Sequence, residues 1–248
     1  MSKFIKKFET HAAYEAAKSS LILPNVSICK DVPNEVHYNP FDPYNSHDYV
    51  EIGGLKWATM NIGATSITDY GLYFQWGDTQ GYTASQVGSG SGQKYFGWED
   101  YKYITNAGTS SSAFTKYNST DGKVLLDASD DAATAAWGSS WRLPTTAEYA
   151  ALGTATISAW TASYKGSGVS GLVLTDKTDS SKVLFFPAAG GCFYGSVLDV
   201  GSFGYYWSSP LYSSNVKGAY GLGFDSSSMN WQNISYRCNG FCARAVLA

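Results

Sequence analysis

Residues 49–58, YVEIGGLKWA, have the pattern of a β-hairpin. Two short runs of β-branched, apolar and aromatic residues flank Gly53 and Gly54, and a Gly-Gly pair between such runs is typical of a two-residue hairpin turn. Other short apolar runs of the kind that form buried strands follow at 72–76, 172–174 and 183–186. From Tyr49 onward we therefore expect one continuous, strand-rich domain.

Two short helices are predicted by signals at their N-termini. Asp130 and Asp131 precede an alanine-rich run that ends at Trp137, and the helix dipole favours acidic side chains at such a start. Thr145 and Glu148 form a T-x-x-E capping box ahead of the next apolar residues. Because both helices are short, we expect them to cover a sheet.

The composition indicates a folded, loop-rich β protein. Of the 248 residues, 16% are aromatic, only 15% are charged and 26 are glycine, whereas disordered chains are charge-rich and aromatic-poor. The length suits one large domain with a small appendage. Residues 79–122, rich in Gly, Ser, Thr and Tyr, are expected to form a long surface excursion.

The first 46 residues are predicted to form a small module of their own. Thr10 can cap a short alanine-rich helix that runs to Ala17. A proline-bearing stretch at 39–47 marks the domain boundary, which divides the chain into residues 1–46 and 47–248. Strand-like runs in the module lie at 21–23, 26–28 and 36–38.

Charge and hydropathy argue against nucleic-acid and membrane partners. The net charge is −3, and Lys and Arg cluster only at Lys3, Lys6 and Lys7, whereas nucleic-acid binders present a basic face. No stretch approaches the roughly 18 apolar residues that span a bilayer, so we expect no membrane insertion. No apolar run of about 7–15 residues follows the early lysines, so synthesis in a cytoplasm without a signal peptide is expected.

The cysteines predict free thiols. Only Cys238 and Cys242 lie close together, and the other two are Cys29 and Cys192. No histidine lies near the pair, so the four N/S ligands of a zinc site are not available in that segment. In a reducing compartment such thiols stay unpaired. We expect no metal and no cofactor.

The residues of an active site are not recognisable. All three histidines precede residue 48, so a Ser-His-Asp arrangement would have to bridge the two predicted modules. The Glu99-Asp100 pair could supply a glycosidase-like carboxylate. Asp130 and Asp131 are explained more simply by a helix start. The sequence therefore predicts a protein that is not an enzyme.

Residues 190–248 combine many aromatics with few charges. Tyrosine supplies contact area at low entropy cost, and Ser, Gly and Asn supply adaptable hydrogen bonds, so this mix is typical of a binding surface. Some aromatics are expected to fill a core instead: Tyr206, Trp207, Phe224 and Trp231. The glycine-flanked Phe203 and Tyr205 are expected to be exposed.

Several motifs in a fixed order carry a family resemblance. They are VEIGGLKWATMNIGA at 50–64, DYG at 69–71, WGD at 76–78, DDAA at 130–133, WGSSWRLPT at 137–145, FPAAG at 186–190, YWSS at 206–209 and the run 237–246. Together they resemble the C-type-lectin-like domains of gut Bacteroidetes and their phages, of the major-paralogous type, which are related in fold to formylglycine-generating enzymes. The resemblance implies an α+β, C-type-lectin-like fold in which short helices cover a small twisted antiparallel sheet with many loops.

Within that group, residues 190–248 resemble the variable region of a target protein of a diversity-generating retroelement. In such proteins, adenine-directed mutagenesis of AAY-type codons randomises chosen positions on the lectin-like face, and Lys, Met, Gln and Trp cannot arise from those codons. The fixed neighbours would then be Trp207, Lys217, Met229, Trp231 and Gln232. The resemblance implies ligand-binding positions whose side chains point outward together: Phe203, Tyr205, Leu211, Tyr212, Gly221, Gly223, Asp225, Asn230, Asn233, Ser235, Cys238, Asn239 and Phe241.

The resemblance implies a non-catalytic ligand-binding protein, displayed on a phage virion to bind a bacterial surface protein or glycan. The N-terminal module, with FIKKF at 4–8 and LPNVS at 23–27, resembles leader modules of proteins from Bacteroidales phages and prophages. It implies virion attachment for residues 1–46, and a virion-surface location after cytoplasmic synthesis. A homotrimer would suit a virion tip, although no coiled-coil heptads enforce one.

Two alternatives stay open. The same domain could serve, without diversification, as an adhesin on the bacterial cell surface. It could also be an enzyme of the formylglycine-generating or glycosidase type, with Cys242 or Glu99 as the reacting group. Sugar-binding lectins of this fold hold calcium with Glu-Pro-Asn or Gln-Pro-Asp and Trp-Asn-Asp, and these triplets are absent. Calcium-dependent sugar recognition is therefore not expected.

Overall fold

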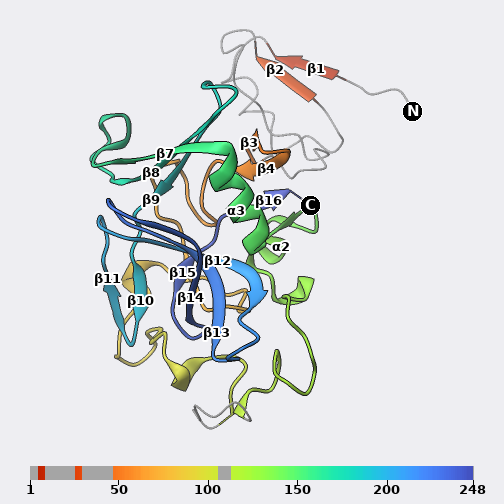
Figure 1. Ribbon diagram of the computed structural model, residues 1–248, viewed down its shortest axis with the longest axis vertical. Coiled ribbons are helices and arrows are strands. Elements are labelled where there is room, and N and C mark those ends of the chain that lie inside the picture. Colours follow the sequence, from red (N-terminus) through yellow and green to blue (C-terminus); the bar gives the residue numbers. More distant parts are fainter. Residues whose placement is uncertain (1–4, 9–25, 30–46, 106–112, 248) are drawn as a thin grey trace. The chain divides into compact units, whose positions relative to one another are not determined.

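The computed structural model describes residues 5–8, 26–29, 47–105 and 113–247 (Figure 1). The chain divides into two units, Met1–His47 and Asp48–Ala248, and each is described by itself. This division falls at the end of the proline-bearing stretch in which the sequence places the domain boundary.

In the first unit, two short strands form a parallel pair. β1 (Ile5–Phe8) lies beside β2 (Val26–Cys29), with Ile5 opposite Val26 and Phe8 opposite Cys29. The predicted strand at 26–28 is thus confirmed. The predicted helix after Thr10 and the predicted strands at 21–23 and 36–38 lie outside the described residues.

The second unit is a mixed α/β fold, dominated by several small, mostly antiparallel sheets with a few short helices. A five-stranded sheet has the order β14 (Met229–Tyr236), β13 (Gly218–Phe224), β12 (Gly204–Leu211), β15 (Phe241–Cys242) and β5 (Tyr73–Phe74). A four-stranded sheet has the order β3 (Tyr49–Ile52), β4 (Leu55–Ala58), β16 (Val246–Leu247) and β6 (Trp141–Arg142). A third sheet contains β7 (Thr156–Thr161), β8 (Gly171–Asp176) and β9 (Val183–Pro187), and a hairpin contains β10 (Gly191–Phe193) and β11 (Ser196–Leu198).

The helices of this unit are short. They are α2 (Ala132–Trp137) and α3 (Thr146–Ala155), with 3-10 turns η2 (Ala84–Gln86), η3 (Trp98–Asp100), η5 (Ala128–Asp130) and η6 (Tyr164–Gly166). Both α-helices begin where the sequence predicts. The Asp131 carboxylate accepts hydrogen bonds from the backbone N–H groups of Ala133 and Thr134, and Thr145 and Glu148 form the capping box.

The predicted hairpin at 49–58 is confirmed as β3 and β4. Gly53 and Gly54 have φ values of 62° and 79°, the left-handed conformation that a tight two-residue hairpin requires of both central residues. β16, near the end of the chain, pairs with β4 through Val246 and Trp57. The end of the domain therefore completes the sheet that its start begins.

The core lies between α3 and the sheets. Tyr149 and Leu152 of α3 are buried in one cluster with Tyr206 and Leu222 of the five-stranded sheet. A Cβ atom at Gly153 would lie 2.5 Å from the Trp231 indole. Because glycine has no side chain, the Trp231 indole of β14 packs directly against the α3 backbone. The prediction that a short helix covers a sheet is thus confirmed for α3.

Arg244 ties the end of the chain to the rest of the core. Its fully buried guanidinium donates to the carbonyl oxygens of Ala58, Thr59 and Phe185 and to Oδ1 of Asn61, at 2.7–3.0 Å. It also stacks 4.4 Å from the centre of the Phe186 ring. These bonds join three segments that are distant in sequence.

The expectation of a surface excursion over 79–122 is wrong for its aromatic residues between Phe96 and Tyr117. Most of its aromatic side chains are buried, namely Phe96, Trp98, Tyr101, Tyr103, Phe114 and Tyr117. Phe114, Tyr101 and Trp76 surround the buried guanidinium of Arg237, at 4.1, 5.3 and 5.6 Å from their ring centres. Contacts between a cation and aromatic rings need no regular spacing along the chain, so no periodic pattern predicted this burial. Residues 89–92 are exposed.

A charged cluster at Asp130 holds this segment against η5. Burial on its own would raise the pKa of the Asp130 carboxyl, but hydrogen bonds from Lys116, Tyr103 and Tyr117 outweigh burial and hold that pKa well below its ordinary value. The folded state therefore binds this proton less tightly than the unfolded chain. The resulting stabilisation is present above about pH 4 and is lost as the pH falls below it.

We expect Asp130→Asn to be less stable than the wild type at pH 7 and to lose less stability on acidification. Urea unfolding of both proteins between about pH 2 and pH 7 measures this. Equal losses of stability below pH 4 in the two proteins would contradict the assignment to Asp130.

Candidate functional site

The five-stranded sheet has one face toward the core and one face away from it. Tyr206 and Leu222, which lie opposite each other on β12 and β13, are 0% exposed on the core side. Because successive residues of a strand point to opposite faces, Tyr205 and Gly223 point the other way, and so do Trp207 and Gly221. We call this second side the outer face.

Aromatic rings form a continuous stack along the outer face. Tyr205 lies between Phe203 and Phe241, with centroid distances of 5.7 and 4.9 Å and interplanar angles of 6° and 17°. Trp207 stacks on Phe241 at 4.4 Å. Phe193 of β10 packs edge-on against Tyr205 and Phe241, at 5.9 and 5.8 Å. Phe193, Phe203 and Tyr205 are half-buried, and the other two rings lie beneath them.

Polar groups border the stack. Burial raises the pKa of the Tyr205 phenol, and the nearby carboxylates of Asp199 and Asp225 raise it further. Asn233 lies beside Gly223, so that a Cβ atom at Gly223 would be 3.1 Å from the Asn233 amide carbon. The open part of the outer face thus combines aromatic rings, amides and two carboxylates.

The structure brings most of the predicted positions together. Those on the outer face by strand register or ring contact are Phe203, Tyr205, Gly221, Gly223, Asn230, Asn233, Ser235 and Phe241. Asp225 lies at the border of this face, in the β13–β14 turn, where its carboxylate accepts hydrogen bonds from the backbone N–H groups of Ser227 and Ser228. Tyr212 lies in the β12–β13 loop.

The expectation that all thirteen side chains point outward is wrong for some of them. Gly221 is buried, and four more are 5% exposed or less: Leu211, Cys238, Asn239 and Phe241. Two of these lie where the chain passes from β14 to β15. There, Nε2 of Gln75 donates to the Cys238 carbonyl at 2.9 Å, and Nδ2 of Asn239 donates to Oγ of Ser235 at 2.8 Å. Both side chains are buried in this connection.

The expectations for the aromatics are largely confirmed. Tyr206, Trp207 and Phe224 are 2% exposed or less, and Trp231 is half-buried against the core. Phe203 and Tyr205 are half-buried, more accessible than these core rings but less open than expected.

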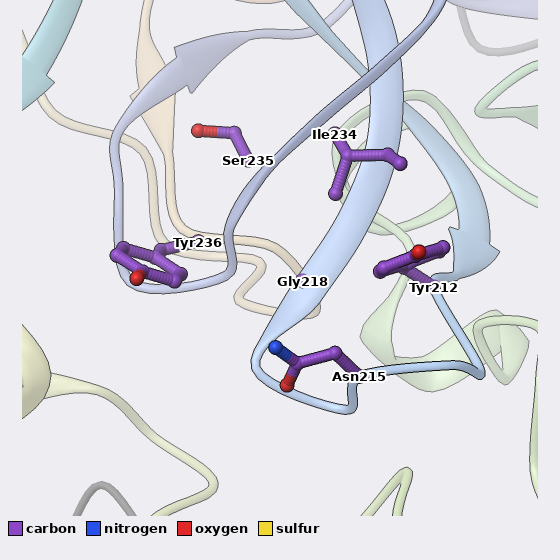
Figure 2. A pocket seen from close by; sticks show the side chains of 6 residues that line it. All are labelled: Tyr212, Asn215, Gly218, Ile234, Ser235 and Tyr236. Atoms are coloured by element: carbon purple, nitrogen blue, oxygen red, sulfur yellow. The ribbon is translucent and has the colours of Figure 1, made fainter.

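A groove opens at the end of the β12–β13 hairpin. It has a volume of about 230 Å³ and is lined by Tyr212, Asn215, Gly218, Ile234, Ser235 and Tyr236. Figure 2 shows Tyr212 and Tyr236 on opposite sides of Gly218, with Asn215 in the loop below. Glycine at 218 keeps the floor free of a side chain. None of the lining residues is charged.

Sequence reasoning missed Phe193, Asn215, Ile234 and Tyr236 as members of this surface. The first belongs to a separate hairpin, and only tertiary contact brings it to the stack. The other three lie beside predicted positions in an aromatic-rich, charge-poor segment, so the composition alone could have included them.

The three cysteines of the second unit, Cys192, Cys238 and Cys242, are unsuited to nucleophilic chemistry. Burial raises the pKa of the Cys238 thiol to about 12 and raises those of Cys192 and Cys242 as well. Because the thiolate is the reactive form, these thiols stay protonated at neutral pH. The three are free of disulfide bonds. Among the described residues no group of three or more His, Cys, Asp or Glu side chains could hold a metal ion.

The carboxylates of Glu99 and Asp100 lie in two different environments. The Asp100 carboxylate accepts hydrogen bonds from the backbone N–H groups of Tyr95, Phe96 and Gly97 at 2.9–3.1 Å. It therefore organises the loop before η3. Glu99 is exposed on η3.

Comparisons of the chain with protein-family models, with curated proteins and with solved structures found no match. In the part of the chain that the structure describes, no helix combines the length and apolar character needed to cross a membrane.

An inner ring and an end ring of the aromatic stack are expected to respond differently to substitution. Phe241→Ala should lower the free energy of unfolding by about 3–5 kcal/mol, because it leaves a cavity between Tyr205 and Trp207. Phe203→Ala removes a half-buried terminal ring and should cost roughly 1 kcal/mol or less. Urea unfolding followed by tryptophan fluorescence measures both, and equal losses would show that the stack is not layered as described.

Proposed function

We propose that this chain is a non-catalytic ligand-binding protein with a C-type-lectin-like domain, and that it binds its ligand with the outer face and the adjoining groove. One observation carries the proposal: aromatic side chains from β10, β12 and β15 stack on the side of the sheet that faces away from the core. The buried rings of Trp207 and Phe241 support the half-open rings of Phe203 and Tyr205.

This arrangement suits recognition for a physical reason. A side chain that is already held by its neighbours loses little conformational entropy on binding, so more of the contact energy appears as affinity. Tyr205 has a ring on each face, which fixes its orientation before a ligand arrives. Its phenolic edge and the nearby amide of Asn233 then supply directional hydrogen bonds.

We further propose that a retroelement diversifies this surface, and that residues 1–46 attach the protein to a phage virion that binds a bacterial surface protein or glycan. The sequence resemblance supports this part of the proposal. The packing supports fewer variable positions than the thirteen that the sequence resemblance implies. Eight predicted positions tolerate many side chains because they are partly or fully exposed: Phe203, Tyr205, Tyr212, Gly223, Asp225, Asn230, Asn233 and Ser235.

One observation favours the second candidate, an undiversified adhesin on a bacterial surface. Randomising a buried position such as Phe241 or Asn239 would disrupt the fold in many variants. A protein that keeps these residues constant loses nothing by burying them.

Sequencing the locus separates the two candidates. The proposal requires a reverse-transcriptase gene and a near-copy of the 3′ end that carries adenines at the codons of the exposed positions. Absence of both would remove diversification and leave the adhesin. Adenines at the buried codons and none at the exposed ones would contradict the packing argument.

A binding experiment tests the recognition surface directly. The full chain is labelled and titrated onto cells of gut Bacteroidetes strains, and the strain that binds is used for variants. We expect Tyr205→Ala to weaken binding about 10-fold or more, as for a central aromatic anchor. Ile157→Ala is the matched control, because Ile157 is 61% exposed on β7, in a different sheet. Equal binding by both variants would contradict the assignment of ligand binding to the outer face.

A further inference from the structure

β14 is an edge strand of the five-stranded sheet. It contains eight residues, MNWQNISY, with no charge and no proline. Proteins usually protect such edges with lysine, proline or very short strands, because the unpaired backbone groups can pair with another chain. β14 has none of these, and its one irregularity is a shift of register opposite Gly221 and Gly223. Beyond that shift, residues 233–236 form a regular ladder with β13.

The hydrogen-bond pattern shows which backbone groups point away from the sheet. The N–H of Arg237 donates to the carbonyl of Lys217 at 2.9 Å, so Tyr236 and Gly218, which lie opposite each other, form a non-hydrogen-bonded pair. Such pairs alternate with hydrogen-bonded ones, so Ile234 and Tyr220 form the next non-hydrogen-bonded pair. The N–H and C=O of Ile234 and the N–H of Tyr236 therefore point outward from the edge.

The surroundings of this edge fit an uncharged strand. Ile234 and Tyr236 are 45% and 49% exposed, and both line the groove shown in Figure 2. Asn233 and Ser235 alternate with them on the outer face. A strand added beside β14 would therefore place alternate side chains over the groove and over the outer face. No charged side chain lines the groove or belongs to β14, so a charged partner segment would lose hydration without gaining an ion pair.

We propose that the protein engages its ligand partly by strand addition: an extended, uncharged segment of a partner protein pairs with β14 at Ile234 and Tyr236 and inserts an apolar side chain into the groove. This inference rests on the proposed function, because it names the kind of partner that the recognition surface takes. Backbone pairing supplies affinity in such a mode, and the groove supplies selectivity.

The test uses a displayed library of random twelve-residue peptides, selected on the full chain. Ile234→Pro removes an N–H group that the ladder does not use, and edge strands tolerate proline at such positions. Ile234→Lys keeps the N–H and adds the charge that protects natural edges. Ser158→Pro is the matched control. The N–H of Lys177 donates to the carbonyl of Ala155, so Ser158 and Leu174 form a non-hydrogen-bonded pair and the Ser158 N–H points outward from β7, the edge of another sheet. Circular dichroism checks the fold of each variant.

We expect enriched peptides with uncharged centres, in which β-branched or aromatic residues alternate with small polar ones. Their affinity should fall about 10-fold or more in Ile234→Pro, which removes one pairing N–H group. A similar fall is expected in Ile234→Lys, which places an unpaired charge beside the added strand, and affinity should stay unchanged in Ser158→Pro. Failure to enrich peptides, or equal binding by folded Ile234→Pro, would overturn the proposal. So would a dimer in sedimentation that Ile234→Pro dissociates, because a second copy would then be the occupant.

The cell-binding experiment keeps the two proposals separate. Loss of cell binding in Tyr205→Ala with full binding in Ile234→Pro would retain the recognition surface and remove strand addition. Full cell binding in both variants would remove the proposed function, whatever the peptides show.

Discussion

Arg244→Met is expected to lower the free energy of unfolding by about 4 kcal/mol or more, which would leave little or no folded protein at 37 °C. The guanidinium serves the carbonyls of Ala58, Thr59 and Phe185 and the amide oxygen of Asn61. Methionine fills the volume but donates nothing, and each buried acceptor left without a partner costs about 1–3 kcal/mol.

The matched control is Arg237→Met. Arg237 is equally buried, but its Nε and Nη2 atoms have no hydrogen-bond partner, and only Nη1 donates, to the carbonyls of Lys116 and Tyr117. Methionine would relieve those two unsatisfied groups and keep the contact with Phe114. We expect a loss of about 1 kcal/mol or less. Urea unfolding compares the two, and a larger loss in Arg237→Met would contradict the hydrogen-bond accounting.

Gly221→Ala is expected to cost about 3 kcal/mol. A Cβ atom at this position would lie 2.4 Å from the backbone oxygen of Tyr206, and a backbone atom in the middle of a sheet can move aside only if β12 moves. Position 221 was predicted to vary, yet its surroundings leave no room for any side chain.

Gly223→Ala provides the comparison, two residues away on the same strand and the same face. The new Cβ atom would meet the Asn233 side chain at 3.1 Å, and that side chain can rotate away. We expect a loss of less than about 1 kcal/mol. In a set of natural variants, position 223 should therefore vary while position 221 stays glycine. Equal thermal stability of the two alanine variants would refute the distinction.

Much of the local structure could be predicted from the sequence because its signals are local. The Gly53-Gly54 turn, the Asp131 cap and the Thr145–Glu148 capping box each depend on residues within a few positions of one another. The strand at 183–186 was equally clear, since a run of apolar residues bounded by turns indicates a buried strand. The apolar run at 72–76 yielded only the two-residue strand β5, because pairing with Phe241 and Cys242 sets its length.

The outcome for the candidate site was mixed. Composition identified the segment, and the exposure expected of Phe203 and Tyr205 was partly right. Cys238 and Asn239 are buried where tertiary contacts meet the β14–β15 connection, such as the hydrogen bond from Gln75 to the Cys238 carbonyl. Those contacts join residues more than 100 positions apart, and no spacing along the chain encodes them.

The sequence by itself determined where both α-helices and the first hairpin begin, that the domain is rich in strands, and which segment is aromatic and charge-poor. Turn chemistry, capping and composition act over a few residues, so they can be recognised without a fold. Only the tertiary structure decided which aromatic rings are buried as supports and which stay partly exposed on the outer face. The same phenyl ring is half-open at Phe203 and almost fully buried at Phe241. Burial depends on what packs above a residue, and at Phe241 that is Tyr205 and Phe193, from strands that only folding brings together.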